Sequence, residues 1–146
     1  MNMKKAFFLV AVAVLASAGN AMACKCATAN QEFGYAAKNS PLVFSGQLVS
    51  VTDVKKSGAA GAYTIKVFKF VPDKIWRGTK ADTITLVGGN NNCDVRLEKG
   101  RYVIYTNSSR DLTICDRTIA NNIEKETMKL DRLFTRKRFK QLQAAG

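Results

Sequence analysis

The sequence predicts a mainly β fold: a small, closed or nearly closed barrel of five strands, with a short helix before it and a basic helix after it. Three observations predict this fold. Five short apolar segments are separated by turn-forming residues, four cysteines follow an export leader, and a helical pattern begins after the last cysteine. A chain of 146 residues with 47% hydrophobic content suits one globular domain with a modest core.

Residues 1–23 have the pattern of a cleaved signal peptide. Lys4 and Lys5 precede an uncharged apolar run at 6–18, and Ala21-Met22-Ala23 provides the small residues that signal peptidase requires. The run is shorter than the roughly 20 residues that cross a bilayer, and no transmembrane segment is expected elsewhere. We therefore expect a secreted or periplasmic protein whose first residue is Cys24.

A lipoprotein acylated at Cys24 is the alternative reading of this leader. The sequence argues against it, because Ala21 stands where such signals carry a large aliphatic residue. Acylation would also leave three cysteines, an odd number in an oxidising compartment.

Composition excludes most hydrolase chemistry. The chain has no histidine, so it contains no Ser-His-Asp triad, no Cys-His nucleophile and no imidazole zinc site. Six aspartates near turns and strand ends are interpreted as solvated turn residues rather than a catalytic pair. These aspartates are Asp53, Asp73, Asp82, Asp94, Asp111 and Asp116. We therefore expect that the protein is not an enzyme and uses no cofactor.

The four cysteines are expected to form two disulfides in an exported chain. Cys24 and Cys26 are separated only by Lys25, too close for a relaxed bridge, so each is expected to pair with either Cys93 or Cys115. Both patterns fasten the N-terminal end of the mature chain to the domain by closing loops of about 70 to 90 residues. A zinc site is disfavoured, because the distant cysteines are single.

Elements are expected in the following order. A short helix at 27–38 ends at Asn39-Ser40-Pro41. The strands follow at 42–52, where Gly46 indicates a bulge or sharp bend, and at 62–70, 83–87, 101–107 and 111–115. Residues 24–118 then form the barrel domain.

Residues 119–146 are expected to form the basic C-terminal helix, capped by Asn121 with Glu124 at its third position. Its apolar stripe is Ile123, Leu130, Leu133 and Phe134. A cluster of basic residues follows, and it is a candidate anion-binding site: Arg132, Arg136, Lys137, Arg138 and Lys140.

Four segments in this order resemble the netrin-like module, and most closely the N-terminal domain of the tissue inhibitors of metalloproteinases. They are Cys24-Lys25-Cys26; residues 40–49 (SPLVFSGQLV); residues 63–67 (YTIKV) leading to 74–78 (KIWRG); and Cys93 through Leu97, Gly100 and Tyr102 to Cys115. The resemblance covers about residues 24–116. It implies an OB-type barrel and the disulfides Cys24–Cys93 and Cys26–Cys115.

The resemblance also implies a function. In that family the N-terminal cysteine chelates the catalytic zinc of a metalloprotease through its α-amino nitrogen and carbonyl oxygen, and the next residue enters a specificity pocket. The inhibitory edge would be Cys24, Lys25 and Cys26, and the partner a zinc metalloprotease. Lysine replaces the usual small residue, which favours a target with an acidic or open pocket. The chain also departs from the family at Ala36 and Ala37, where the family has a cysteine.

A binding module without inhibitory activity is the second hypothesis. Without residues 1–23 the chain would keep 21 basic side chains against 11 acidic ones, a charge suited to acidic polysaccharide or an anionic membrane surface, and such a module can also bind a protein partner. Export argues against nucleic acid as a partner. Trp76, Tyr102 and Tyr105 are accordingly interpreted as packing residues rather than base-stacking platforms.

Overall fold

A computed structural model describes residues 24, 26–59, 61–89 and 95–144. Its centre is one sheet of six strands: β1 (Leu42–Gly58), β2 (Gly61–Arg77), β3 (Ile84–Gly88), β4 (Gly100–Thr106), β5 (Asp111–Leu112) and β6 (Arg117–Ile119). Before the sheet come the 3-10 helix η1 (Thr28–Gln31) and the helix α2 (Phe33–Asn39). After it comes α3 (Ile123–Ala144).

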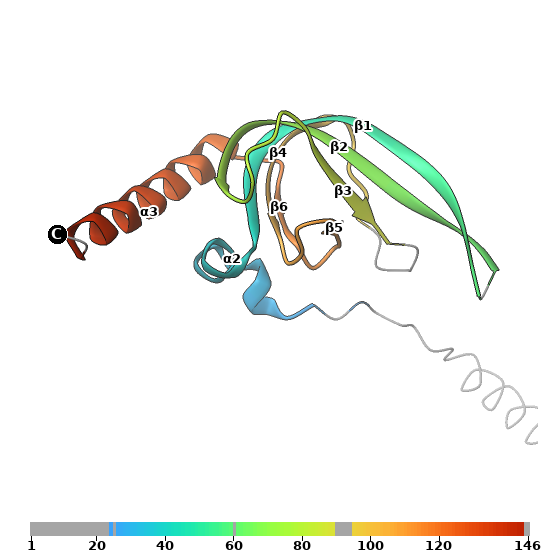
Figure 1. Cartoon of the computed structure of the whole chain (residues 1–146), viewed down its shortest axis with the longest axis horizontal. Coiled ribbons are helices and arrows are strands. Elements are labelled where there is room, and N and C mark those ends of the chain that lie inside the picture. The colour runs from blue at the N-terminus through green and yellow to red at the C-terminus, as the bar shows by residue number, and fades with distance from the viewer. Residues whose placement is uncertain (1–23, 25, 60, 90–94, 145–146) are drawn as a thin grey trace, which may run out of the picture.

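The strands lie in the order β5-β3-β2-β1-β4-β6. All neighbours are antiparallel except β3 and β5, which pair in parallel at two positions. The sheet curls into a half-barrel, with α3 extending from one end and the β1–β2 hairpin projecting at the other (Figure 1). The expected mainly β architecture is therefore confirmed, whereas the five-strand count is wrong by one strand.

Long strands form the hairpin. β1 and β2 each have 17 residues and pair with each other as far as Gly58 and Gly61. β1 continues beyond its predicted end at 52 to Gly58, and β2 continues beyond its predicted end at 70 to Arg77. The pairing register shifts between Ser45 and Gly46, which confirms the expected irregularity at Gly46. A Cβ at Gly46 would lie 2.6 Å from the Val71 carbonyl oxygen, so only glycine fits this crossing.

Both faces of the sheet are covered by hydrophobic residues. On one face, Phe44, Phe68, Phe70 and Ile104 are fully buried and belong to the larger cluster. The opposite face carries Val43, Val103 and Tyr105, against which Ala37 of α2 and Leu130 of α3 pack. Strand β4 contributes alternate residues to each cluster, which explains why its sequence is apolar at successive positions.

The helices differ from the prediction at their beginnings. The segment predicted as a helix at 27–38 divides into η1 and α2, with Glu32 extended between them at φ −78° and ψ 134°. Asn121 does not cap α3, because the helix begins two residues later and Asn122 precedes it with a positive φ of 56°. Asparagine tolerates this left-handed conformation better than most residues.

Two other strand predictions are corrected. The predicted strand 111–115 is only the two residues of β5, because Thr113 to Asp116 form a turn. The sequence also missed β6, which adds three residues to the outer edge of β4 beyond the last cysteine. Three residues are too few to show strand alternation.

Candidate functional site

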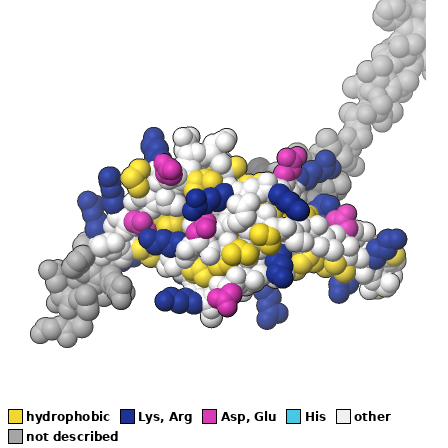
Figure 2. All heavy atoms as spheres, turned by 90° about the horizontal axis from the view of Figure 1, so that it is seen from above, with side chains coloured by type: hydrophobic (Ala, Val, Ile, Leu, Met, Phe, Trp, Pro, Cys, Tyr) yellow, Lys and Arg dark blue, Asp and Glu magenta, His cyan; other side chains and the backbone are white. Residues whose placement is uncertain are grey.

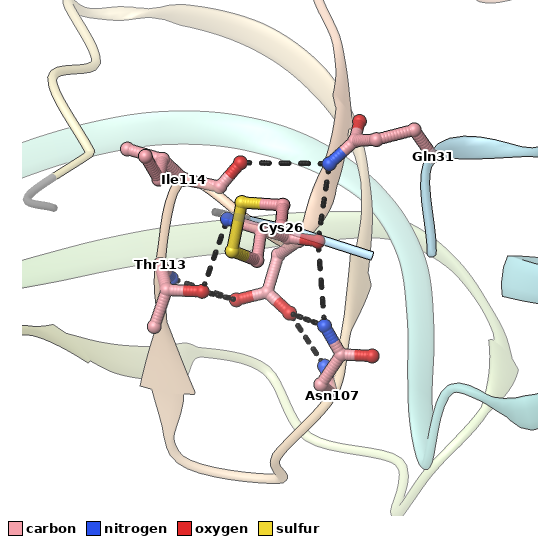
Figure 3. Close-up of a disulfide and its surroundings, with 7 residues drawn as sticks. Cys26, Gln31, Asn107, Thr113 and Ile114 are labelled. Carbon is pink, nitrogen blue, oxygen red and sulfur yellow. Dashed lines mark hydrogen bonds between the residues drawn. A yellow bond between two sulfur atoms is a disulfide. The ribbon is translucent and has the colours of Figure 1, made fainter. Parts of the chain in front are cut away.

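The candidate site is the N-terminal segment and the loop to which it is attached. A disulfide joins Cys26 to Cys115, with Cα atoms 5.1 Å apart and a sequence separation of 89 positions (Figure 3). This is the pairing that the family resemblance implies for these two cysteines. It fixes the chain two residues after Cys24 to the turn that follows β5.

Hydrogen bonds reinforce this attachment. The Gln31 side-chain amide donates to the carbonyl oxygen of Cys115 at 3.1 Å and to that of Ile114 at 3.5 Å (Figure 3). In the opposite direction, the Arg117 guanidinium donates to the carbonyl oxygen of Gln31. Residues 26–31 are therefore held against the segment 114–117 at both of their ends, by the disulfide at one and by Gln31 at the other.

Asp116 organises the loop that carries Cys115. Its side chain is buried, and each carboxylate oxygen accepts two hydrogen bonds. One oxygen accepts from the backbone and side-chain nitrogens of Asn107 at 2.6 and 2.8 Å, and the other from the backbone N–H and hydroxyl of Thr113 at 2.7 and 3.2 Å. A buried carboxylate with this many donors is well stabilised. Asp116 therefore closes the loop as a buried residue, and the interpretation of it as a solvated turn carboxylate is wrong.

A buried ionic cluster joins this region to α3. Arg117 Nη2 lies 2.7 Å from the Glu126 carboxylate, the Tyr105 hydroxyl donates to the same carboxylate at 2.9 Å, and the guanidinium lies over the Tyr105 ring. Burial alone would raise the pKa of Glu126, but hydrogen bonds from Arg117 and Tyr105 outweigh it and lower that pKa. Burial and the bond to Glu126 raise the pKa of Tyr105.

Part of the predicted inhibitory edge lies outside the described residues. Lys25 is one such residue, and Cys93 is another, so the Cys24–Cys93 disulfide stays a prediction. Cys24 itself is half-buried, and no described cysteine is a free thiol. Among the described residues, no three or more histidine, cysteine, aspartate or glutamate side chains form a group that could hold a metal ion.

Only three of the five side chains of the predicted basic cluster are described by the structure. Arg132, Arg136 and Lys137 are exposed on α3, while the side chains of Arg138 and Lys140 lie outside the described part of the chain. Figure 2 shows lysine and arginine side chains along the whole length of one face, not only near α3. Lys137 and Lys74 of β2 line the same cleft, a juxtaposition that the sequence pattern does not show.

Several aspartates and aromatic residues have structural roles. Asp53 pairs with Lys66 at 2.8 Å and Asp73 with Arg101 at 2.9 Å. Both aspartates lie within the long strands β1 and β2, so the prediction that they sit near turns and strand ends is wrong. Asp94 lies outside the described residues. Tyr102 and Tyr105 are buried in the two clusters, which confirms their interpretation as packing residues.

Sequence reasoning missed Gln31, Arg117 and Glu126, the polar residues that tie the N-terminal segment to the domain. A glutamate in an otherwise apolar stripe, three residues after Ile123, was the available signal for Glu126. Nothing in the sequence marks Gln31 or Arg117, which are 86 residues apart and meet only in the fold.

Comparisons with known proteins add no family. No model of a known protein family matches the chain, and no curated protein matches it in a sequence search. Within the described residues, none of the helices combines the length and the apolar composition needed to span a membrane.

Proposed function

We propose that the protein is an exported inhibitor of a zinc metalloprotease and that it acts through Cys24 once the leader is removed. The observation that carries this proposal is the attachment of the N-terminal segment. The Cys26–Cys115 disulfide and the Gln31 and Arg117 hydrogen bonds fix residues 26–31 to the turn after β5 and to β6. We also interpret the curled sheet as an OB-type barrel and pair Cys24 with Cys93, as the resemblance implies.

The chemistry requires little from the protein beyond a well-placed terminus. A catalytic zinc keeps one coordination position for the water that attacks the substrate. The α-amino nitrogen and carbonyl oxygen of Cys24 form a five-membered chelate with that zinc and displace the water. An α-amino group has a pKa near about 8, so competition by the metal readily removes its proton.

Attachment of the terminus makes this ligation favourable. A chain end usually frays, and ordering it on binding costs conformational entropy. Here Cys26 is already held by the disulfide, and Cys24 lies only two residues before it. Less entropy is therefore lost when the terminus enters an active site.

Lys25 sets the expected target class. A lysine ammonium in a deep apolar pocket would lose hydration without a partner, at a cost of several kcal/mol. The favoured target is therefore a zinc protease whose primed-side pocket carries a carboxylate or opens to solvent.

An inhibition assay with two forms of the mature protein tests the proposal. The first form begins at Cys24, checked by intact mass, and the second carries one added alanine before Cys24. The extension turns the α-amine into an amide, which cannot coordinate zinc, and leaves all other residues unchanged. We expect the first form to inhibit a zinc protease stoichiometrically and the second to lose at least about 100-fold in inhibition, the contribution expected of a metal ligand.

Two outcomes would overturn the proposal. One is an exported protein whose mature N-terminus lies upstream of Cys24 or is acylated. The other is equal inhibition by both forms, because binding would then not depend on the α-amine.

A further inference from the structure

A cleft between β2 and α3 is the strongest unassigned site in the described structure. Its volume is about 600 Å³, within the range of small-ligand sites. The strand contributes Lys74, Trp76 and Arg77, and the helix contributes Asp131, Phe134 and Lys137. It therefore combines three cations, one carboxylate and two aromatic rings.

The cleft is lined by more cationic side chains than acidic ones. Lys74 is paired with Asp131 at 2.5 Å, and the Trp76 indole donates to the same carboxylate oxygen at 2.7 Å. Arg77 and Lys137 approach one ring: the guanidinium carbon lies 5.4 Å and the Lys137 ammonium 5.7 Å from the centre of Phe134. Asp131 is already paired with Lys74, so the positive charges of Arg77 and Lys137 have no carboxylate partner among the residues that line the cleft.

The positions of these groups are fixed by other parts of the fold. Arg77 Nη1 donates to the carbonyl oxygens of Lys38 and Ser40 at 2.8 Å each, which holds the guanidinium at the end of α2. Trp76 and Phe134 pack on the cluster beneath the helices. The hydrogen bond from Lys74 lowers the pKa of Asp131, so this carboxylate stays ionised at neutral pH.

We propose that this cleft binds an acidic saccharide, a sugar unit that carries sulfate or carboxylate groups within a polymer. Arg77 and Lys137 bind the anionic group through charge-assisted hydrogen bonds. Asp131 accepts only, so it recognises a hydroxyl donor, which sugars carry and simple anions lack. The exposed Arg132 and Arg136 extend the positive charge along α3, where a polymer presents further anionic groups.

A lipid surface suits the site less well. The cleft is concave and lies between a strand and a helix, whereas a bilayer presents a flat array of headgroups. The saccharide proposal is independent of zinc ligation by Cys24, and each can fail without the other.

Trp76 allows binding to be observed at the cleft itself. It is the only tryptophan in the chain, so a change in intrinsic fluorescence reports on this site. The mature protein is titrated with heparin oligosaccharides, with neutral dextran of similar size, and with vesicles containing phosphatidylglycerol. We expect heparin alone to change the fluorescence, with an affinity that falls as salt is added.

A matched pair of variants separates the cleft from general charge attraction. Lys137→Gln removes a charge inside the cleft, whereas Lys125→Gln removes the same charge from the first turn of the same helix, outside the cleft. Both side chains are exposed, so both variants should fold, which circular dichroism checks. We expect Lys137→Gln to weaken heparin binding about fivefold or more and Lys125→Gln to weaken it less than twofold.

Three results would overturn the saccharide proposal: equal effects of the two variants, a response to dextran equal to that for heparin, or a response to vesicles without one to heparin.

Discussion

Arg117 of β6 and Glu126 of α3 form the most buried ion pair among the described residues, with side chains 17% and 6% exposed and a nitrogen–oxygen distance of 2.7 Å. The same guanidinium donates to Gln31 in the N-terminal segment. One side chain therefore connects the last strand, the C-terminal helix and the N-terminal segment at Gln31. Arg117 therefore joins α3 to Gln31, which lies five positions after Cys26 of the proposed inhibitory edge.

Glu126→Gln should destabilise the protein by about 2 kcal/mol, because Arg117 would keep its buried position without a countercharge. Urea unfolding measures the free energy. The control is Glu124→Gln, which removes the same charge from the exposed side of the first turn and should change stability by less than about 0.5 kcal/mol. Equal losses in the two variants would show that the ion pair has no special role.

The same ion pair predicts a pH dependence. The pKa of Glu126 is lowered from 4.5 in the folded protein, so folding favours the ionised form. Its contribution is complete above the unfolded pKa and is lost as pH falls through the lower, folded pKa. The stability difference between wild type and Glu126→Gln should therefore be constant from about pH 7 to 5 and shrink below about pH 4.5. A difference that persists unchanged in acid would contradict this assignment.

Removing the Cys26–Cys115 disulfide by the double substitution to serine should cost about 4 to 5 kcal/mol. The bridge spans 89 residues, and a loop of this length strongly restricts the unfolded chain. Thermal or urea unfolding under non-reducing conditions provides the measurement. A loss below about 1 kcal/mol would mean that Gln31 and Arg117 hold the N-terminal segment without the bridge.

Gly46→Ala should destabilise the protein by about 2 kcal/mol or more, because its Cβ would lie 2.6 Å from the Val71 oxygen and 2.9 Å from the Pro72 Cα. Backbone atoms cannot give way as a flexible side chain can. Gly34→Ala is the matched control: nothing lies within 4 Å of its Cβ, and alanine favours the helix by up to about 1 kcal/mol. In chemical denaturation, Gly46→Ala should lower the free energy of unfolding and Gly34→Ala should raise it. An unchanged free energy of unfolding for Gly46→Ala would contradict the close crossing of β1 and β2.

Local patterns in the sequence predict the larger elements of this fold. The apolar residues of β4 and the stripe on α3 mark elements whose faces are buried, and Gly46 marks an irregular crossing. Short elements are not predictable in this way. β6 and β5 are defined by hydrogen bonds to distant strands, not by their own residue pattern.

The candidate sites, like the fold, are predictable from the sequence only in part. Cys26 and Lys137 carry recognisable chemistry in the sequence, so both were expected to matter. Their surroundings depend on contacts between distant residues: Gln31 meets Arg117, and Lys74 meets Asp131, 57 positions later. Such pairs follow from the packing of α3 against the sheet, which no local pattern encodes.

The visible spectrum of a cobalt-substituted target protease tests the central claim most directly, because it reports on the ligands of the active-site metal. Adding the mature protein should change the spectrum until one equivalent is bound, as an amine and a carbonyl oxygen replace water. The form with an added N-terminal alanine should leave it unchanged. Inhibition without any change in the metal spectrum would contradict zinc ligation by Cys24.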